Sequence, residues 1–303
     1  MKNVVLFGAG ASYGSPHILP FSPPLSGGLF DNLAQHYPNT WGALPPDYST
    51  EFKSNNLEQG MLKVTESAEH WIGPLMQTMT LFFTSFAPDR SRSDLYSQLL
   101  AQLRTENAIS DTLFSTLNYE CILELAASQL GLTVSYWDIV RSSGSISVWK
   151  LHGSCNFIPN PKQLSVRRVV SYRWGPKFNP SLIPVSPAEA AKWVKGDTAL
   201  YPAMCIFALG KPSQISPRVF ADYRCKWAEL VEEAKNLVVV GVRPHSPDAH
   251  IWEPLAKSQA HLYFVGSEEK FRNWLPNRER RTSCFIGNTF DSAIGTLVHV
   301  LSN

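Results

Sequence analysis

The chain has 303 residues and a formal net charge of +2; 44% of its residues are hydrophobic and 17% are charged. A chain of this length can bury a sizeable core, either as one large domain or as two modest ones. The near-neutral charge excludes a strongly basic surface, so we expect no direct nucleic-acid binding, and we interpret the small basic clusters Arg167-Arg168 and Arg278-Arg280-Arg281 as solvated loop surface.

The sequence begins MKNVVLFGAG, and this apolar stretch is too short for a signal peptide. No stretch reaches the ~18 apolar residues of a spanning helix, so we expect no membrane association and a cytoplasmic location. The cysteines are scattered and form no C-x-x-C pair, which argues against a zinc ribbon or a disulfide framework. We predict buried free thiols at Cys121, Cys155, Cys205, Cys225 and Cys284.

Short apolar runs alternate with amphipathic stretches along the chain, a pattern typical of an α/β fold. The apolar runs suit a parallel sheet that is buried on both faces, with strands over 4–7, 113–116, 147–151, 205–209, 237–240 and 262–265. Helices are predicted over 29–36, 96–104, 120–130, 223–234, 249–259 and 292–301. The prediction is a Rossmann-like, doubly wound parallel sheet.

Two stretches interrupt this alternation. Residues 31–109 hold proline-rich loops and a predicted helix over 58–83, which indicates an inserted helical module. Residues 156–202 carry too many prolines for regular sheet, so we predict an irregular insertion with one short helix near 187–194. The chain is thus predicted to be a single domain, with its core formed by 1–30, 110–155 and 203–303.

A glycine-rich turn, Gly8-Ala9-Gly10-Ala11-Ser12, follows the first predicted strand. Glycine lacks the Cβ that would block a phosphate, and backbone N–H groups at such a strand end can bind one. The third glycine of the dinucleotide fingerprint is missing from its usual place, unless Gly14 serves. Two interpretations stay open: a pyrophosphate-binding turn, or a tight turn that needs glycine for its backbone alone.

Two polar clusters follow later strands, Ser115-Thr116-Leu117-Asn118-Tyr119-Glu120 and Lys150-Leu151-His152-Gly153-Ser154. The carboxyl edge of an open α/β sheet is where ligands bind. Asn118 is either the N-cap of the next helix or a neutral amide that holds a ribose hydroxyl or a water. His152 is either structural or a base that accepts a proton near neutral pH.

Potential metal ligands, His245, Asp248 and His250, share one later loop. Pro244 and Pro247 break that segment, and we predict no metal.

In their order along the chain, the glycine turn and the two polar clusters resemble the signature segments of the sirtuin (SIR2) superfamily. Val238-Val239-Val240-Gly241 resembles its later nucleotide-contacting strand end, and the likeness runs from about residue 3 to Phe264-Val265-Gly266-Ser267. The chain closely resembles the bacterial SIR2-like NAD-hydrolase branch, whose members serve in anti-phage defence. That branch commonly carries the motifs G-A-G-A-S, T-x-N-Y-D and L-H-G-S.

The resemblance implies that NAD is the substrate and that the bond between nicotinamide and ribose is cleaved. It implies that Asn118 orients water or the ribose hydroxyls and that His152 is the general base. The NAD-binding residues implied are Gly8, Ala9, Gly10, Ala11, Ser12, Thr116, Gly241, Arg243, Gly266 and Ser267.

The sequence departs from the family pattern at three points. Glu120 stands in place of Asp, with a longer reach. Gly241-Val242-Arg243 stands in place of Gly-Tyr-Ser or Gly-Thr-Ser, so a hydroxyl contact to NAD is lost, and Arg243 either meets a phosphate or seals the site. The two close cysteine pairs of protein-deacylase sirtuins are absent, which argues against deacylation. A deacylase or ADP-ribosyltransferase, and a non-catalytic NAD-binding scaffold, stay open as alternatives.

An ungated NAD hydrolase would kill its host. We therefore expect the trigger to lie in a separate regulatory subunit or in assembly into a homo-oligomer. In families of this kind, partners resemble a HerA-type ATPase or an Argonaute-like protein, and the activity serves abortive infection.

Overall fold

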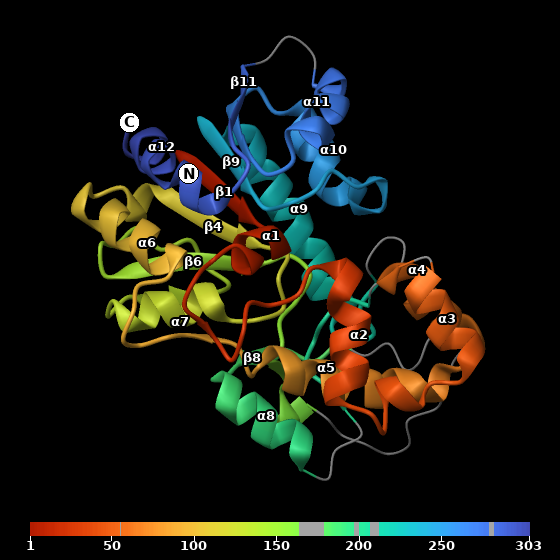
Figure 1. Ribbon diagram of the computed structural model, residues 1–303. Coiled ribbons are helices and arrows are strands. Elements are labelled where there is room, and N and C mark those ends of the chain that lie inside the picture. The colour runs from red at the N-terminus through yellow and green to blue at the C-terminus, as the bar shows by residue number, and fades with distance from the viewer. Residues whose placement is uncertain (55, 164–178, 197–199, 207–211, 279–281) are drawn as a thin grey trace.

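A seven-stranded parallel sheet organises the computed structural model, which describes residues 1–54, 56–163, 179–196, 200–206, 212–278 and 282–303 (Figure 1). Its strands follow the order β11-β10-β9-β1-β4-β6-β5. Their bounds are β1 Asn3–Phe7, β4 Thr112–Thr116, β5 Thr133–Ser135, β6 Ser145–Lys150, β9 Asn236–Val240, β10 His261–Val265 and β11 Ser283–Gly287. Because the chain builds outward from β1 in both directions, the predicted Rossmann-like, doubly wound α/β fold is confirmed.

Strand β1 lies at the centre of the sheet, and all of its residues are buried. Val5 and Phe7 belong to the apolar cluster on one face of the sheet, and Val4 and Leu6 belong to the cluster on the other. This alternation is what a strand covered on both faces requires. Asn3 pairs in register with Thr112 of β4 and with Asn236 of β9, so the first strand joins both halves of the sheet.

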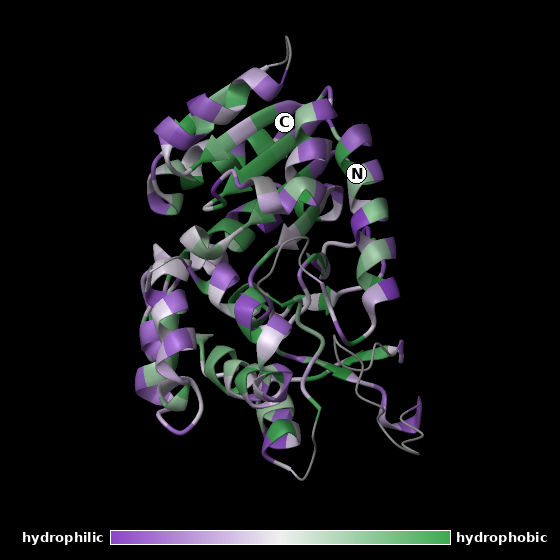
Figure 2. Cartoon of the chain, turned by 90° about the vertical axis from the view of Figure 1, so that its right-hand side faces the viewer, coloured by the Kyte–Doolittle hydropathy of each residue, from purple (hydrophilic) through white to green (hydrophobic). Residues whose placement is uncertain are grey.

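Helices cover both faces of the sheet, and Figure 2 shows their hydrophilic residues on the outside and the hydrophobic strands between them. One face carries α6 Leu95–Thr105, α7 Ile122–Gln129 and α12 Phe290–Ser302. The other carries α9 Pro217–Glu233, α10 Ala249–Lys257 and α11 Glu268–Trp274. No helix among the described residues combines the length and apolar character needed to cross a bilayer.

The helical module contains α2 Ser26–His36, α3 Pro46–Ser54, α4 Leu57–Ser67 and α5 Ile72–Phe83. The prediction of one helix over 58–83 was wrong, because the chain breaks at Ala68 and restarts at Ile72. Pro74 lacks a backbone N–H and fits only the first turn of a helix, so it sets this restart. The stretch 31–109 that was predicted to form the helical module also includes α6. Helix α6 packs against α7 and α12, so it belongs to the helical layer on one face of the sheet.

The proline-rich insertion forms a small antiparallel pair, β7 Phe157–Pro159 with β8 Leu182–Pro184, and then α8 Pro187–Lys195. Helix α8 confirms the short helix predicted there, and a capping box between Ser186 and Glu189 starts it. The strand predicted over 205–209 is not formed at Cys205 and Ile206, and its remainder lies outside the described residues. The Cys205 N–H donates to the carbonyl of His152 instead of joining the main sheet.

Three cysteines are buried as predicted, namely Cys121, Cys155 and Cys205. The prediction was wrong for Cys225 and Cys284, which are exposed. Cys225 lies on the outer side of α9, and Cys284 lies on β11, the last strand at one edge of the sheet that the described residues form.

Arg278 corrects the interpretation of the basic cluster as solvated surface, because its side chain is buried. Its guanidinium donates to the carbonyls of Leu255 and Ala260 and to the hydroxyl of Ser283. These acceptors lie on three segments around α10, so Arg278 ties the end of that helix to the start of β10 and β11. Arg167, Arg168, Arg280 and Arg281 lie outside the described residues.

We expect Arg278→Met to lower the free energy of unfolding by about 2–4 kcal/mol, because buried carbonyls lose a charged donor. Urea denaturation measures this change. The matched control is Arg272→Met, which removes an exposed arginine paired with Glu268 and is expected to cost less than about 1 kcal/mol. Equal unfolding midpoints for the two variants would contradict a stabilising role for Arg278.

Candidate active site

A cleft of about 610 Å³ opens at the carboxyl edge of the sheet, over the ends of β1, β4, β6, β9 and β10. The chain order reverses here, since β1 has β4 on one side and β9 on the other. Open α/β sheets bind their ligands at such a switch point. Helices α2 and α4 of the helical module form the opposite wall, with Leu29, Leu57 and Glu58 among its residues.

The structure brings most of the predicted site residues to this cleft. Those that line it are Gly8, Ala9, Gly10, Ser12, Asn118, His152, Gly241, Arg243, Gly266 and Ser267. Ala11 and Thr116 lie buried beneath it. Thr116 contacts Asn118 from beneath the cleft, because its hydroxyl accepts the N–H of Asn118 at 3.0 Å.

The glycine turn is held against the end of β9 by its backbone. The Gly8 N–H donates to Val240 O at 2.9 Å, and the Gly10 N–H donates to Gly241 O at 3.0 Å. A Cβ on Gly8 would lie 2.7 Å from Gly241 O, a distance that real Cβ atoms do not adopt. Both glycines are therefore needed for a close approach of two backbones. Ala9, the exposed first residue of the short helix α1 Ala9–Tyr13, is the part of the turn that faces outward.

The side-chain amide of Asn118 is fixed by three acceptors. Its Nδ2 donates to Gly8 O at 3.2 Å, to Ser12 Oγ at 3.0 Å and to Glu120 Oε1 at 2.9 Å. Since these contacts occupy Nδ2 and Asn118 lines the cleft, Oδ1 is the atom that it offers to a ligand. The N-cap interpretation of Asn118 was wrong, because α7 begins at Ile122 with Cys121 as its N-cap.

Glu120 connects the glycine turn to Asn118, a role that the sequence did not reveal. One carboxylate oxygen accepts from Ser12 Oγ at 2.6 Å and from Asn118 Nδ2, and the other accepts from the Ile122 N–H at 2.7 Å. Burial raises the pKa of Tyr96, so its hydroxyl stays protonated and donates to Ser12 Oγ at 2.8 Å. The result is a buried chain of hydrogen bonds that ends on Asn118.

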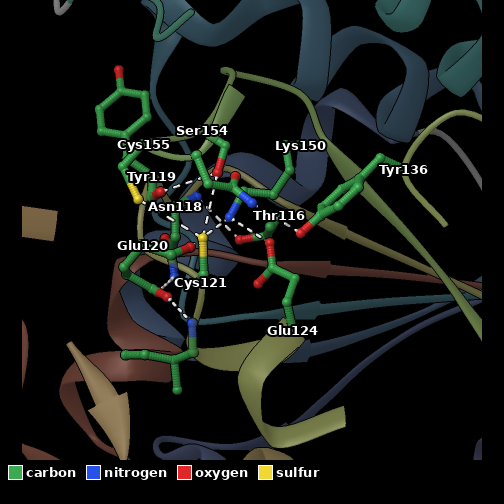
Figure 3. Close-up of polar contacts among 12 residues, drawn as sticks. Thr116, Asn118, Tyr119, Glu120, Cys121, Glu124, Tyr136, Lys150, Ser154 and Cys155 are labelled. Carbon is green, nitrogen blue, oxygen red and sulfur yellow. Dashed lines mark hydrogen bonds and ion pairs between the residues drawn. The ribbon is translucent and has the colours of Figure 1, made fainter. Parts of the chain in front are cut away.

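A buried lysine, Lys150, lies beside this segment, as Figure 3 shows. Lys150 Nζ donates to Glu120 O and lies 3.0 Å from the carboxylate of Glu124. Burial lowers the pKa of Lys150 and the Glu124 carboxylate raises it, with a net upward shift, so the lysine stays charged. Cys121 and Cys155 lie beside it, with sulfurs 3.8 Å apart.

We expect Glu120→Gln to slow the NAD cleavage that the sequence resemblance implies by up to ~10²-fold, because the loss of one acceptor lets Asn118 and Ser12 shift from their positions. Steady-state kinetics checks this, with a fall in kcat as the expected signature. The matched control, Glu66→Gln on the exposed side of α4, should leave kcat unchanged. If kcat is equal in the two variants, Glu120 does not position Asn118.

His152 lies on the loop after β6 and is 5% exposed. Its Nε2 lies 2.9 Å from Nε2 of His250 and 3.8 Å from Oδ1 of Asp248. These three donor atoms lie within 4.8 Å of one another. The sequence placed His250 and Asp248 in a loop of their own and missed their contact with His152.

On the far side of the cleft, a side-chain contact joins the loop after β9 to α4. His245, on the loop after β9, lies 2.8 Å from Oε2 of Glu58 on α4. This contact joins the Rossmann-like core to the helical module across the cleft. Arg243 is exposed on the same loop, and Ser267 caps α11 by accepting the Lys270 N–H.

No protein-family model matches the chain, and no curated protein matches it. Among solved structures, the chain is similar to a SIR2 homolog in complex with NAD, at 17% identity and a TM-score of 0.45 over 99% of this chain and 88% of that one. It is also similar to a phenylalanine-to-alanine mutant of a Sir2 homologue in complex with ADP-ribose, at 15% identity and a TM-score of 0.41 over 99% of this chain and 91% of that one.

Proposed function

We propose that this protein is an NAD hydrolase that cleaves the nicotinamide–ribose bond to give nicotinamide and ADP-ribose. The observation that carries the proposal is that Asn118 and His152, at the ends of β4 and β6, line one cleft together with the glycine turn of β1. We infer that NAD is the substrate from the resemblance of these three segments to the SIR2 motifs. The cleft volume lies in the range of small-molecule and cofactor sites.

In the proposed reaction, nicotinamide leaves as the ribose passes through an oxocarbenium-like state and water adds to C1′. Asn118 orients the water or the ribose hydroxyls through Oδ1, and His152 accepts the proton. The dinucleotide pyrophosphate lies over the glycine turn, with Arg243 near a phosphate. Gly266 and Ser267 lie toward the adenosine. Holding NAD and water in this geometry accounts for much of the rate acceleration, because the two reactants no longer have to meet and orient in solution.

The cysteines favour hydrolysis of NAD over deacylation of a protein. Cys121 and Cys155 meet in the core, while Cys225 and Cys284 are exposed on α9 and β11. This arrangement does not suit a four-thiolate zinc module.

The test is to incubate the purified chain with NAD and to quantify nicotinamide and ADP-ribose by chromatography, without any peptide. Equal amounts of both products are expected. NAD binding without turnover, with or without a partner, would instead establish a scaffold. Nicotinamide release that requires an acylated peptide would establish a deacylase.

We further propose that the activity is gated by a separate subunit, of HerA-type ATPase or Argonaute-like kind, or by homo-oligomerisation. The anti-phage role of the resembled branch supports an abortive-infection effector that acts in the cytoplasm. The check is a comparison of NAD cleavage by the isolated chain and by its complex. An isolated monomer with the full activity of the complex would contradict gating.

A further inference from the structure

We propose that His152 and His250 act as one proton-accepting unit, with Asp248 as its counter-charge. The inference rests on the proposed function, because it assigns a destination to the proton that His152 removes during NAD hydrolysis.

The two imidazole rings face each other nitrogen to nitrogen. His152 follows β6 and His250 lies in the first turn of α10, and their Nε2 atoms are 2.9 Å apart. The ring centroids are 5.1 Å apart and the ring planes cross at 48°. For a given distance between the Nε2 atoms, the ring centroids are farthest apart when both nitrogens lie on the line that joins the centroids. The observed separation is close to that limit, so both Nε2 atoms lie near this line. One ring therefore donates its Nε2–H and the other accepts it.

This contact defines a balanced proton transfer. A His152 that donates from Nε2 keeps a lone pair on Nδ1, and Nδ1 takes a proton from the attacking water, directly or through a ribose hydroxyl. As it does so, the Nε2 proton of His152 passes to Nε2 of His250. The new O–C1′ bond forms while the C1′–N bond breaks and its electron pair leaves on nicotinamide. His152 ends neutral as its other tautomer, and His250 ends as an imidazolium.

Asp248 stabilises the positive charge that this transfer creates. Its Oδ1 is 3.8 Å from Nε2 of His152, and the residue is 8% exposed. A carboxylate this close favours the charged form of an imidazole and offsets part of the cost of burying that charge. The pair can therefore hold one proton readily, whereas a second would place two like charges in contact.

Other ionisable groups around the pair come from four segments, namely α4, the loop after β9, α9 and the segment after β4. Oε2 of Glu58 on α4 lies 2.8 Å from Nε2 of His245 after β9, so this carboxylate is directed at His245. Arg224 on α9 donates to the carbonyl that precedes His152 in the chain. Tyr119 after β4 stays neutral, because burial raises its pKa. Glu120, from the same segment, accepts hydrogen bonds from three donors.

The same three side chains could in principle hold a divalent metal ion, since two imidazoles and a carboxylate form a common donor set. A metal requires both nitrogen lone pairs to converge on a point beside the line that joins the nitrogens. Here the nitrogens point at each other, so the geometry assigns a shared proton.

The experiment follows the ¹⁵N shifts of the imidazoles in the full chain, labelled at histidine, between about pH 5 and pH 9 and without NAD. We expect His152 and His250 to titrate together in two steps, and His152 in His250→Gln to titrate in one. Nicotinamide release is then measured over the same range. In His250→Gln, the rate of nicotinamide release should fall, but by less than the ~10²–10⁴-fold that removing a positioned base costs. The dependence of this rate on pH should also change shape.

His261→Gln, which alters an exposed histidine on β10, is the matched control and should leave rate and profile unchanged. Independent one-step titration of both rings in the unmodified protein would overturn the proposal. So would a pH–rate profile of unaltered shape in His250→Gln, or stoichiometric Zn²⁺ binding that His250→Gln abolishes. A coupled titration in a protein that never cleaves NAD would support the shared proton and count against the NAD hydrolase alone.

Discussion

Replacing Asn118 or His152 with alanine is expected to lower nicotinamide release by roughly 10²–10⁴-fold, while leaving the fold intact. Asn118→Ala removes the amide oxygen that we propose orients the water or the ribose, and His152→Ala removes the proposed base. Initial rates of NAD cleavage, together with urea unfolding midpoints, separate these losses from a loss of structure.

The controls for these variants are exposed residues of the same types, Asn273→Ala on α11 and His261→Ala on β10. Asn118→Asp sharpens the test, because a carboxylate there would face Glu120 and cannot donate to Gly8 O. It should therefore be as inactive as Asn118→Ala and less stable. Full activity in both alanine variants would remove the basis for assigning the cleft to NAD hydrolysis.

Gly241→Ala is expected to lower the free energy of unfolding by about 2–5 kcal/mol and to abolish NAD cleavage. Gly241 has φ +67°, a backbone conformation that an alanine adopts only under strain. Its Cβ would also overlap the backbone nitrogen of Ala11, and neither backbone can give way without parting β9 from the glycine turn. Thermal or urea unfolding measures the first effect, and nicotinamide release measures the second.

Gly295→Ala provides the matched glycine control, because Gly295 lies in α12 with no atom within 4 Å of the new methyl group. There, alanine should stabilise the protein by roughly 0.5–1 kcal/mol through its higher helix propensity. If Gly241→Ala behaves like this control, the close contact between the turn and β9 is not a structural requirement.

The sequence predicted the inner sheet well because β1 and β9 are apolar runs after their first residue, and β4 centres on Leu113 and Phe114; all three strands are buried along their whole length. It did not predict β5 or β11, because they lie at the edges and none of their residues is fully buried. The polar ends of β4 and β6 likewise marked Asn118 and His152, since a parallel sheet brings its carboxyl ends to one edge.

The remaining site features depend on contacts that have no local signature. His152 and His250 are 98 residues apart and meet only because α10 packs beside the end of β6. The role of Glu120 depends on Ser12, which is 108 residues away. Arg278 was interpreted as surface because its neighbours in sequence are basic, whereas its acceptors come from the end of α10, from the residue before β10 and from β11.

The placement of β1 at the centre of the sheet sets the order in which the protein can assemble during synthesis. This strand emerges early, yet its partners lie 109 residues away on β4 and 233 residues away on β9. Closing such long loops is slow, and pairing with β9 must wait until that strand has left the ribosome. The glycine turn therefore meets Gly241 only late in translation. A nascent or truncated chain that lacks β9 therefore cannot form the cleft.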